Sequence, residues 1–469
     1  MEEITRESVR QKLFEKYIAP TDGRKKNLIG IEIEMPLVNK KREPVDFDIV
    51  HLITAEFMDA FSFVVEKTDE EGQVISAVNE ETGDILSYDC SYNNLELSMG
   101  AERELFEIHD RFRTYYVWLQ DAFSKYDHGI TGMGVNPYRC INRQEPIHNG
   151  RYRMLFHHLK SFEFYRSMPK YFHEYPGYGL FSSASQVQLD VKRENLIQTI
   201  RVFSLLEPVK AVLFANSVML NPEAKKPENN LQINRDMFWE ASTHGINPHN
   251  IGMFDKLPET EEELLSYIEL TSIYCVERGE KYINFTPIPL QEYFSKHVVE
   301  GEYFDGKEYQ KIEIVPELSD IAYLRTFKFE DLTFRGTIEY RSCCCQPISD
   351  FMVIAAFHLG LSNRLDELDE LLKNDNSIYH RGYTATELRK LFTRATLPDF
   401  VDADAFYGLV NDVLSLARDG LAERGLHEEV FLDPLFERAR RRSNPAQDML
   451  WDLAAGNPIE HYIEKYGKI

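Results

Sequence analysis

A short segment near the start of the chain, residues 28–35, alternates apolar side chains with carboxylates at a period of two. Side chains of a strand point alternately to its two faces, so the segment predicts a strand with Glu32 and Glu34 on one face and apolar residues on the other. Two neighbouring carboxylates on one face repel each other unless a cation or a basic group lies between them. A solvated outer face of an antiparallel sheet would give the same alternation. In both interpretations the segment requires a sheet with one buried and one polar face.

Three further segments repeat this design. In segment 94–98 one carboxylate lies on one face of the predicted strand and two leucines lie on the other. In segment 186–191 polar residues lie on one face and valine and leucine on the other. Segment 335–341 is predicted as a fourth strand of this kind. The polar side chains that these segments present are Glu96; Gln186, Gln188 and Asp190; and Arg335, Thr337, Glu339 and Arg341. Oxygen ligands suit Mg²⁺, and Mg²⁺ together with arginine suits phosphate. The four segments therefore predict a sheet whose polar face is an active site for a metal-bound nucleotide.

The order of the predicted elements indicates the fold class. Strands are expected early and in the middle of the chain, and helices mostly around and after them. The expected helices span 1–20, 101–126, 190–220 with a break near Pro208, 349–373, 403–424 with Gly425 as a C-cap, and 445–465. This order predicts an α+β fold in which helices wrap an antiparallel sheet. No shift in composition divides the chain, so we expect one catalytic domain over 1–469, with a helical C-terminal part over 349–469.

Charge and composition limit the partners and the compartment. A formal net charge of −24 argues against a nucleic-acid or anionic membrane surface, so an anionic substrate must meet a local basic site. Six cysteines in 469 residues do not make a disulfide framework. The N-terminus lacks the apolar segment of a secretory signal, and no apolar run is long enough to span a bilayer. We therefore expect a cytoplasmic protein that acts on small molecules, and the sequence leaves its oligomeric state open.

The four strand segments, taken in order with their flanks, resemble the plant-type and bacterial glutamate–cysteine ligases. The flanking matches include Gly-Val-Asn-Pro at 134–137, Arg235 with Trp239, and the segment 420–425 near the end of the chain. The resemblance covers most of the chain and implies a glutamine synthetase-like fold. No G-x-x-x-x-G-K-[ST] motif occurs, so a nucleotide would not be held by a P-loop.

The resemblance implies an ATP-dependent carboxylate–amine ligase that forms ADP. Such an enzyme phosphorylates the γ-carboxylate of glutamate, and the amine of cysteine then attacks the acyl phosphate to give γ-glutamylcysteine. ATP would be a cosubstrate, and two or three Mg²⁺ ions would offset the charge of the phosphoryl group. A ligase of the same mechanism that uses another amine is one alternative, and a metal- and nucleotide-binding regulator without turnover is another. All four carboxylate positions on the strands are retained although these groups repel one another, and this argues against the regulator.

The resemblance also implies roles for single residues. The metal-ligand positions of the family match Glu32, Glu34, Asp89, Glu96 and Glu339. Gln186 and Gln188 would lie near the metal and the nucleotide. Arg235 would contact the nucleotide phosphates, and Arg341 the γ-phosphate and the glutamyl group. Without the resemblance, these arginines would be interpreted as ordinary structural ion pairs or caps.

One departure from the family concerns substrate binding. Thr333 stands where relatives usually carry an arginine that helps to hold the substrate carboxylate. We predict that Thr333 and Arg335 lie on one face of a strand, about 7 Å apart, and that Arg335 binds the glutamate α-carboxylate in place of the missing arginine. A change in the acyl or amine substrate is the alternative.

Cysteine and histidine offer other chemistries that we expect not to apply. Cys343, Cys344 and Cys345 are consecutive, and no partner pair with zinc-ligand spacing occurs, so we expect most of them to be buried as small hydrophobic residues. The histidines at 157–158, 244 and 249 lack the motif of a metalloprotease. We interpret them as surface or substrate-loop residues.

Overall fold

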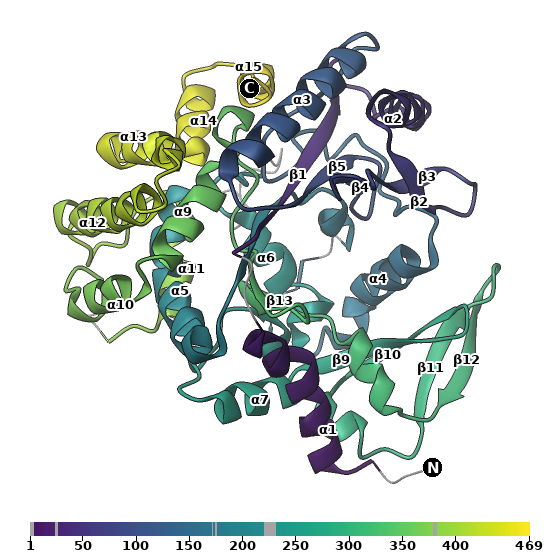
Figure 1. The fold of residues 1–469 in the computed structure, drawn as a ribbon. Helices are drawn as coiled ribbons and strands as arrows, with labels where there is room; N and C mark the ends of the chain where they lie inside the picture. Colours follow the sequence, from purple (N-terminus) through teal and green to yellow (C-terminus); the bar gives the residue numbers. More distant parts are fainter. Residues whose placement is uncertain (1–3, 24–26, 171, 174–175, 220–230, 379–381) are drawn as a thin grey trace.

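The computed structural model describes residues 4–23, 27–170, 172–173, 176–219, 231–378 and 382–469. Its centre is a nine-stranded sheet in the order β14-β15-β7-β1-β5-β4-β3-β2, with β6 paired to β1. The strands are β1 (Ile29–Asn39), β2 (Val64–Thr68), β3 (Val74–Val78), β4 (Ile85–Tyr88), β5 (Asn94–Glu102), β6 (His128–Ile130), β7 (Ser185–Asp190), β14 (Glu330–Leu332) and β15 (Thr337–Tyr340). Figure 1 shows β1 crossing the middle of the molecule between the helices. The predicted mixed fold of helices and antiparallel sheet is confirmed.

The register of this sheet places the four predicted segments side by side. On one side of β1, Glu34 lies directly opposite Glu96 of β5. On the other side, Glu32 lies opposite Gln186 of β7. Residues of β7 then pair with β15 in the same antiparallel manner. Because directly opposed residues of an antiparallel pair share a face, the polar side chains of β5, β1, β7 and β15 form one row.

Helices cover the apolar face of the sheet, where the side chains of Ile31 and Ile33 are buried. α3 (Leu105–Ser124) packs against β5, and α9 (Val353–Ser362) packs against β7. α5 (Arg193–Leu213) contacts β14. The predicted break near Pro208 is wrong, because α5 continues through this residue. Proline removes one backbone donor, but residues 206–213 are buried among neighbouring elements, and this packing keeps the helix intact.

Several other helix boundaries differ from the prediction. The N-terminal helix is α1 (Arg6–Leu13), followed by a π-helical turn over Phe14–Ile18 and a 3₁₀ turn over Ala19–Asp22; residues 1–3 lie outside the described part. The predicted helix over 101–126 begins later, since residues 101–102 extend β5. α2 (Phe47–Phe61) was not predicted; it is capped by the side chain of Asp46, which accepts a hydrogen bond from Asp48 N.

The helical C-terminal part is more divided than expected. The helices are α9, α10 (Leu365–Asn374), α11 (Ala385–Phe392), α12 (Ala403–Ala422), α13 (Asp433–Arg441), α14 (Pro445–Ala454) and α15 (Ile459–Tyr466). The predicted segment 445–465 splits at Gly456, whose φ of +94° favours glycine. The C-cap of α12 is Glu423 and not the predicted Gly425, which follows two residues later with a φ of +69°.

A second, four-stranded sheet was not predicted. It consists of β9 (Ser272–Arg278), β10 (Lys281–Pro289), β11 (Val299–Phe304) and β12 (Tyr309–Ile314), all antiparallel. In Figure 1 it lies at the lower right, away from α10, α12 and α13 on the left. Between the two sheets, the short strands β8 (Ile251–Gly252) and β13 (Phe327–Lys328) form a parallel pair.

Four more helices complete the fold: α4 (Gly150–Lys160), α6 (Asn234–Glu240), α7 (Glu261–Glu269) and α8 (Leu290–Tyr293). Three glutamates in the first turn of α7 are favourably placed at a helix N-terminus. Within the described ranges, no helix is both long and apolar enough to cross a membrane.

Candidate active site

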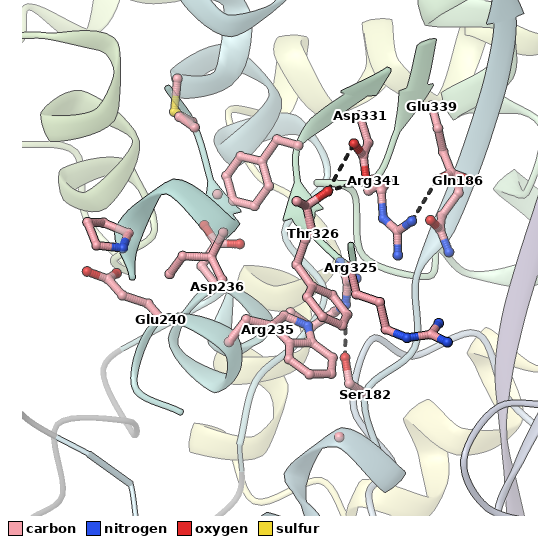
Figure 2. Close-up of a pocket in the computed structure, with 18 of the residues that line it drawn as sticks. Ser182, Gln186, Arg235, Asp236, Glu240, Arg325, Thr326, Asp331, Glu339 and Arg341 are labelled. Carbon is pink, nitrogen blue, oxygen red and sulfur yellow. Dashed lines mark hydrogen bonds and ion pairs between the residues drawn. The ribbon is translucent and has the colours of Figure 1, made fainter. Parts of the chain in front are cut away.

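A cavity of about 700 Å³ lies against the polar face of the central sheet. Figure 2 shows its wall, with side chains from the central sheet, from α6 and from the segment around β13. The predicted site residues that line the cavity are Glu34, Asp89, Gln186, Arg235, Thr333, Arg335, Glu339 and Arg341. The other predicted residues, Glu32, Glu96 and Gln188, are not in its lining, but they belong to the same row on the sheet. The structure therefore brings most of the predicted residues to one cavity and the other three to the adjoining row on the sheet, and their chemical roles stay predictions.

Gln188 links two carboxylates of the row. Its Nε2 donates to Glu32 Oε1 at 2.9 Å and to Glu339 Oε1 at 2.7 Å. Burial raises the pKa of Glu32 to about 8, and the nearby charges of Glu339 and Glu96 act in the same direction. A cation placed here would be stabilised, because it would offset this excess of negative charge.

Glu34 and Glu96 form the second group of the row. Glu34 Oε2 accepts a hydrogen bond from Ala184 N at 2.7 Å, and its Oε1 accepts one from Gln186 Nε2 at 3.0 Å. Burial raises the pKa of Glu34 to about 8, with Asp89 adding to the effect. Burial, Glu34 and Asp89 likewise raise the pKa of Glu96 to about 8. Both carboxylates therefore lack enough positive charge among their protein neighbours.

The donor set of this row fits a hard cation such as Mg²⁺, which prefers carboxylate and amide oxygens. Among the described residues, however, no three His, Cys, Asp or Glu side chains are arranged so that they could hold a metal ion together. The amide nitrogens of Gln186 and Gln188 bind oxygens of Glu34, Glu32 and Glu339 instead. Gln186 Oε1 is buried and has no hydrogen-bond partner among the residues that the structure describes. Rotation of this amide would exchange its nitrogen for an oxygen and present a further ligand to a cation beside Glu34.

Two predicted arginines supply positive charge. Arg341, directly after β15, donates from Nη1 to Glu339 Oε2 at 2.6 Å. Arg235 on α6 is 8% exposed and donates to Ser182 Oγ at 3.1 Å and to the carbonyl of Cys343 at 3.0 Å. Figure 2 shows both side chains at the cavity. Each guanidinium therefore has a fixed position at the cavity wall, where it could contact an anion.

The predicted strand geometry of Thr333 and Arg335 is wrong. These residues belong to the turn that joins β14 to β15, where Gly336 N donates to Thr333 O at 3.1 Å and Gly336 has a φ of +75°. The Thr333 hydroxyl contacts that of Thr337 at 2.7 Å. Arg335 is exposed, and its Nη2 donates to Gln188 Oε1 at 2.5 Å. Pairing of two short strands thus replaces the single long strand that the alternation indicated.

A buried network of charges supports the cavity wall. Arg389 of α11 donates to Glu207 Oε2 at 2.7 Å and to Asp236 Oδ2 at 2.9 Å, and Asp236 is the chain neighbour of Arg235. Lys210 pairs with Glu207 and lies 3.5 Å from Glu330 Oε1. Sequence reasoning missed this network, since its members come from α5, α6, α11 and β14. The network joins these elements at the cavity, which Asp236 and Arg389 themselves line.

Arg325 and Asp331 also line the cavity, and sequence reasoning missed both. Asp331 accepts hydrogen bonds from Thr326 Oγ1 at 3.1 and 2.9 Å. Burial raises the pKa of Asp331 to about 6. Arg325 precedes β13 and Asp331 lies in β14, and these strands of two and three residues are too short to leave a periodic signal in the sequence.

The three consecutive cysteines are buried, as expected. Burial raises the pKa of Cys343 to about 12. The predicted surface position is wrong for His158 and His244, which are buried with their ring centroids 4.7 Å apart. His158 stacks on Tyr274, and burial lowers the pKa of His244 to about 3. These histidines therefore form part of an aromatic core beside the cavity.

Comparisons with known proteins agree with the resemblance. The chain is 23% identical over 271 residues to a chloroplastic glutamate–cysteine ligase of Solanum lycopersicum, and this match covers 56% of the chain and 48% of the relative. It is 24% identical over 303 residues to the corresponding protein of Medicago truncatula, covering 61% of the chain and 54% of the relative. The chain thus spans about half the length of the curated relatives it matches. No family model matches.

One solved structure that the chain resembles is a glutamate–cysteine ligase of Francisella tularensis in complex with AMP. The sequence identity is 12%, and the alignment covers 95% of this chain and 88% of that chain, with a TM-score of 0.47. A TM-score of this size does not by itself establish a shared fold. The similarity to glutamate–cysteine ligases therefore rests on the sequence matches.

Proposed function

We propose that the chain is an ATP-dependent ligase that joins L-glutamate to L-cysteine through a γ-glutamyl phosphate, the first step of a glutathione-type thiol synthesis. The observation that carries the proposal is the row of carboxylates and glutamine amides from Glu96 to Glu339. Four segments far apart in the chain contribute this row to one face of the sheet, beside a cavity with arginines. The sequence similarity to plant glutamate–cysteine ligases supports it. A glutamine synthetase-like arrangement of the sheet is part of the proposal.

The residues of the row would serve as metal ligands in this reaction. Mg²⁺, as two or three ions, would be held by Glu32, Glu34, Glu96 and Glu339, with Asp89 and the two glutamine side chains nearby. Bound there, Mg²⁺ would neutralise the charge of the ATP phosphates. The raised pKa values of Glu32, Glu34 and Glu96 support this role, because buried carboxylates without a cation favour protonation.

The arginines would position the reacting groups. Arg341 and Arg235 would hold the phosphoryl groups, since a guanidinium binds phosphate oxygens with paired hydrogen bonds. An oxygen of the γ-carboxylate attacks the γ-phosphorus of ATP, and ADP leaves. The amine nitrogen of the acceptor then attacks the acyl carbon, loses a proton, and inorganic phosphate leaves. In such a reaction most of the rate gain comes from positioning and charge stabilisation.

A second candidate is a ligase of the same mechanism that uses another amine. The observation in its favour is Thr333, which lies in the turn before β15 and replaces the arginine usual in relatives. Both candidates are tested by incubating the protein with ATP, Mg²⁺ and L-glutamate together with one amine at a time. ADP release and product mass then identify the acceptor. Cysteine as the best acceptor would support the proposal, and no ADP release with any amine would refute both candidates.

A further inference from the structure

Asp331 is a carboxylate in the cavity wall that no cation of the described residues contacts at ion-pair distance. It takes part in no ion pair with another described residue, and its hydrogen bonds come from the hydroxyl of Thr326. It is half-buried and lines the cavity. Burial raises the pKa of this carboxyl more than the charges of Arg341 and Lys328 lower it, so the loss of hydration is only partly offset.

The cations whose charges act on Asp331 are engaged elsewhere. Lys16 donates to the carbonyl of Ile321 at 2.6 Å. Arg341 donates to Glu339 at 2.6 Å. Lys328 is buried and uses its ammonium group for the carbonyl oxygens of Ile251 and Met253 and for the hydroxyl of Tyr267, at 3.0, 2.6 and 2.9 Å. An ammonium group has three donors, so Lys328 has none left for Asp331. The charge of Asp331 is therefore available to a ligand.

Arg325 presents the opposite charge on the same wall. It is the chain neighbour of Thr326, whose hydroxyl holds Asp331. Its Nε is buried and has no hydrogen-bond partner, and no carboxylate of the described chain forms an ion pair with it. Figure 2 shows Arg325, Thr326 and Asp331 along one side of the cavity, with Arg341 and Glu339 beside Asp331. An anion and a cation that do not neutralise each other fit a ligand that carries both charges.

We propose that Asp331 and Arg325 bind the α-ammonium and the α-carboxylate of the acyl-donor amino acid. This inference rests on the proposed function and adds which residues bind the two charged groups on the α-carbon of the donor. The ammonium of the donor keeps its proton throughout the reaction, whereas the acceptor amine must lose a proton before it attacks. A carboxylate contact favours the protonated amine, so it suits the donor and would hinder the acceptor.

The position of Asp331 on the sheet agrees with this orientation. It lies directly opposite Glu339 in the pairing of β14 with β15. The donor's γ-carboxylate would then face Arg341 and the carboxylate row, while its α-carbon would lie at the end of the row. The same register allows another role for Asp331, because it would extend the row as one more metal ligand. The experiment below separates a metal ligand from an ammonium ligand.

The test uses three ligands that differ by one group. Glutarate lacks the α-ammonium of glutamate, and 4-aminobutyrate lacks its α-carboxylate. Their binding to the full chain is measured by titration calorimetry, without turnover, for the wild type, Asp331→Asn and Arg325→Met. The matched control is Asp255→Asn, which makes the same change at an exposed carboxylate of the same cavity.

We expect Asp331→Asn to weaken glutamate binding about 10- to 100-fold, as for loss of a hydrogen bond between charged groups, and to leave glutarate binding within about threefold. Arg325→Met should weaken the binding of glutamate and glutarate and spare 4-aminobutyrate. Thr326→Val, which keeps the charge of Asp331 but frees its side chain, should give a smaller loss for glutamate. Asp255→Asn should leave all three affinities unchanged.

Other outcomes would overturn the inference. Equal binding of glutamate and glutarate by the wild type would show that no ammonium site exists. Equal losses for glutamate and glutarate in Asp331→Asn, with a higher Mg²⁺ requirement, would make Asp331 a metal ligand. A changed KM for the amine and not for glutamate would assign the site to the acceptor. If the wild type binds glutamate selectively but no amine supports ADP release, the proposed function fails while the amino-acid site stands.

Discussion

Glu330 should hold a proton at neutral pH, and replacing it with glutamine tests the charge balance at the cavity. The buried network contains the cations Lys210 and Arg389 and the acids Glu207, Asp236 and Glu330. Burial alone would raise the pKa of Glu207, but Lys210 and Arg389 outweigh it and lower this pKa to about 2. Burial and the charge of Glu207 raise the pKa of Glu330 to about 8. A protonated Glu330 leaves two positive and two negative charges.

The pKa of Glu330 determines how its contribution to stability depends on pH. Between pH 4.5 and about 8 the unfolded chain releases this proton while the folded chain retains it. The free energy of unfolding therefore falls as pH rises through this range, and the full shift corresponds to about 5 kcal/mol. Glu330→Gln cannot ionise in either state. It should lie within about 1 kcal/mol of the wild type at pH 5, because an uncharged amide replaces an uncharged acid, and should be several kcal/mol more stable at pH 8.

Lys210→Met provides the opposite perturbation. It removes a fully buried cation and leaves Glu207 with Arg389 as its remaining cationic partner. Loss of one member of a buried ion pair costs about 3–5 kcal/mol, since the remaining charge is left buried without its partner. We therefore expect Lys210→Met to be destabilised throughout the pH range in which Glu330→Gln is neutral or stabilised.

Urea unfolding followed by intrinsic fluorescence at pH 5, 6, 7 and 8 measures these differences. Glu370→Gln, an exposed acid on α10, is the matched control and should follow the wild type at each pH. A Glu330→Gln curve that runs parallel to the wild type from pH 5 to 8 would show that Glu330 is ionised in the folded protein. That result would refute the charge balance described for the network.

Three further predictions concern the reaction. Glu339→Gln should lower kcat about a hundredfold or more, as for loss of a main electrostatic stabiliser, while the protein still folds. Near-normal turnover of this variant would contradict the place of Glu339 in the metal site. Arg335→Ala should change the KM for glutamate less than about threefold, because contacts of an exposed arginine contribute little binding energy. A strong increase in this KM would instead favour the sequence prediction that Arg335 binds the α-carboxylate. ADP and phosphate should be the stoichiometric products, and AMP as the product would instead indicate adenylation. A sulfoximine analogue of the tetrahedral adduct should be phosphorylated by ATP and then bind far more tightly than glutamate.

The row of polar side chains could be predicted because its signal is local. Glu32, Glu34 and Glu96 each alternate with apolar residues, and alternation assigns a strand residue to a face without knowledge of its partners. The structure places these residues as the pattern indicates, with Glu34 directly opposite Glu96. The antiparallel sheet and its polar face were therefore accessible from the sequence.

The turn between β14 and β15 could not be predicted in the same way. Thr333 and Arg335 continue the alternation of the strand that follows, but Gly336 adopts a positive φ and the chain reverses there. The reversal depends on pairing of β14 with β15, a contact that alternation does not encode. For the same reason Pro208 did not end α5, because packing against neighbouring elements outweighed the local signal.

The sequence by itself thus determined which residue types alternate and which faces they share. Only the tertiary structure decided which charges have partners. Arg389 pairs with Glu207, which lies 182 residues earlier in the chain, whereas Asp331 and Arg325 form no ion pair with another described residue. His158 and His244 are buried because separate elements close over them. Pairing and burial depend on distances between segments far apart in the chain, and the order of the residues alone does not contain those distances.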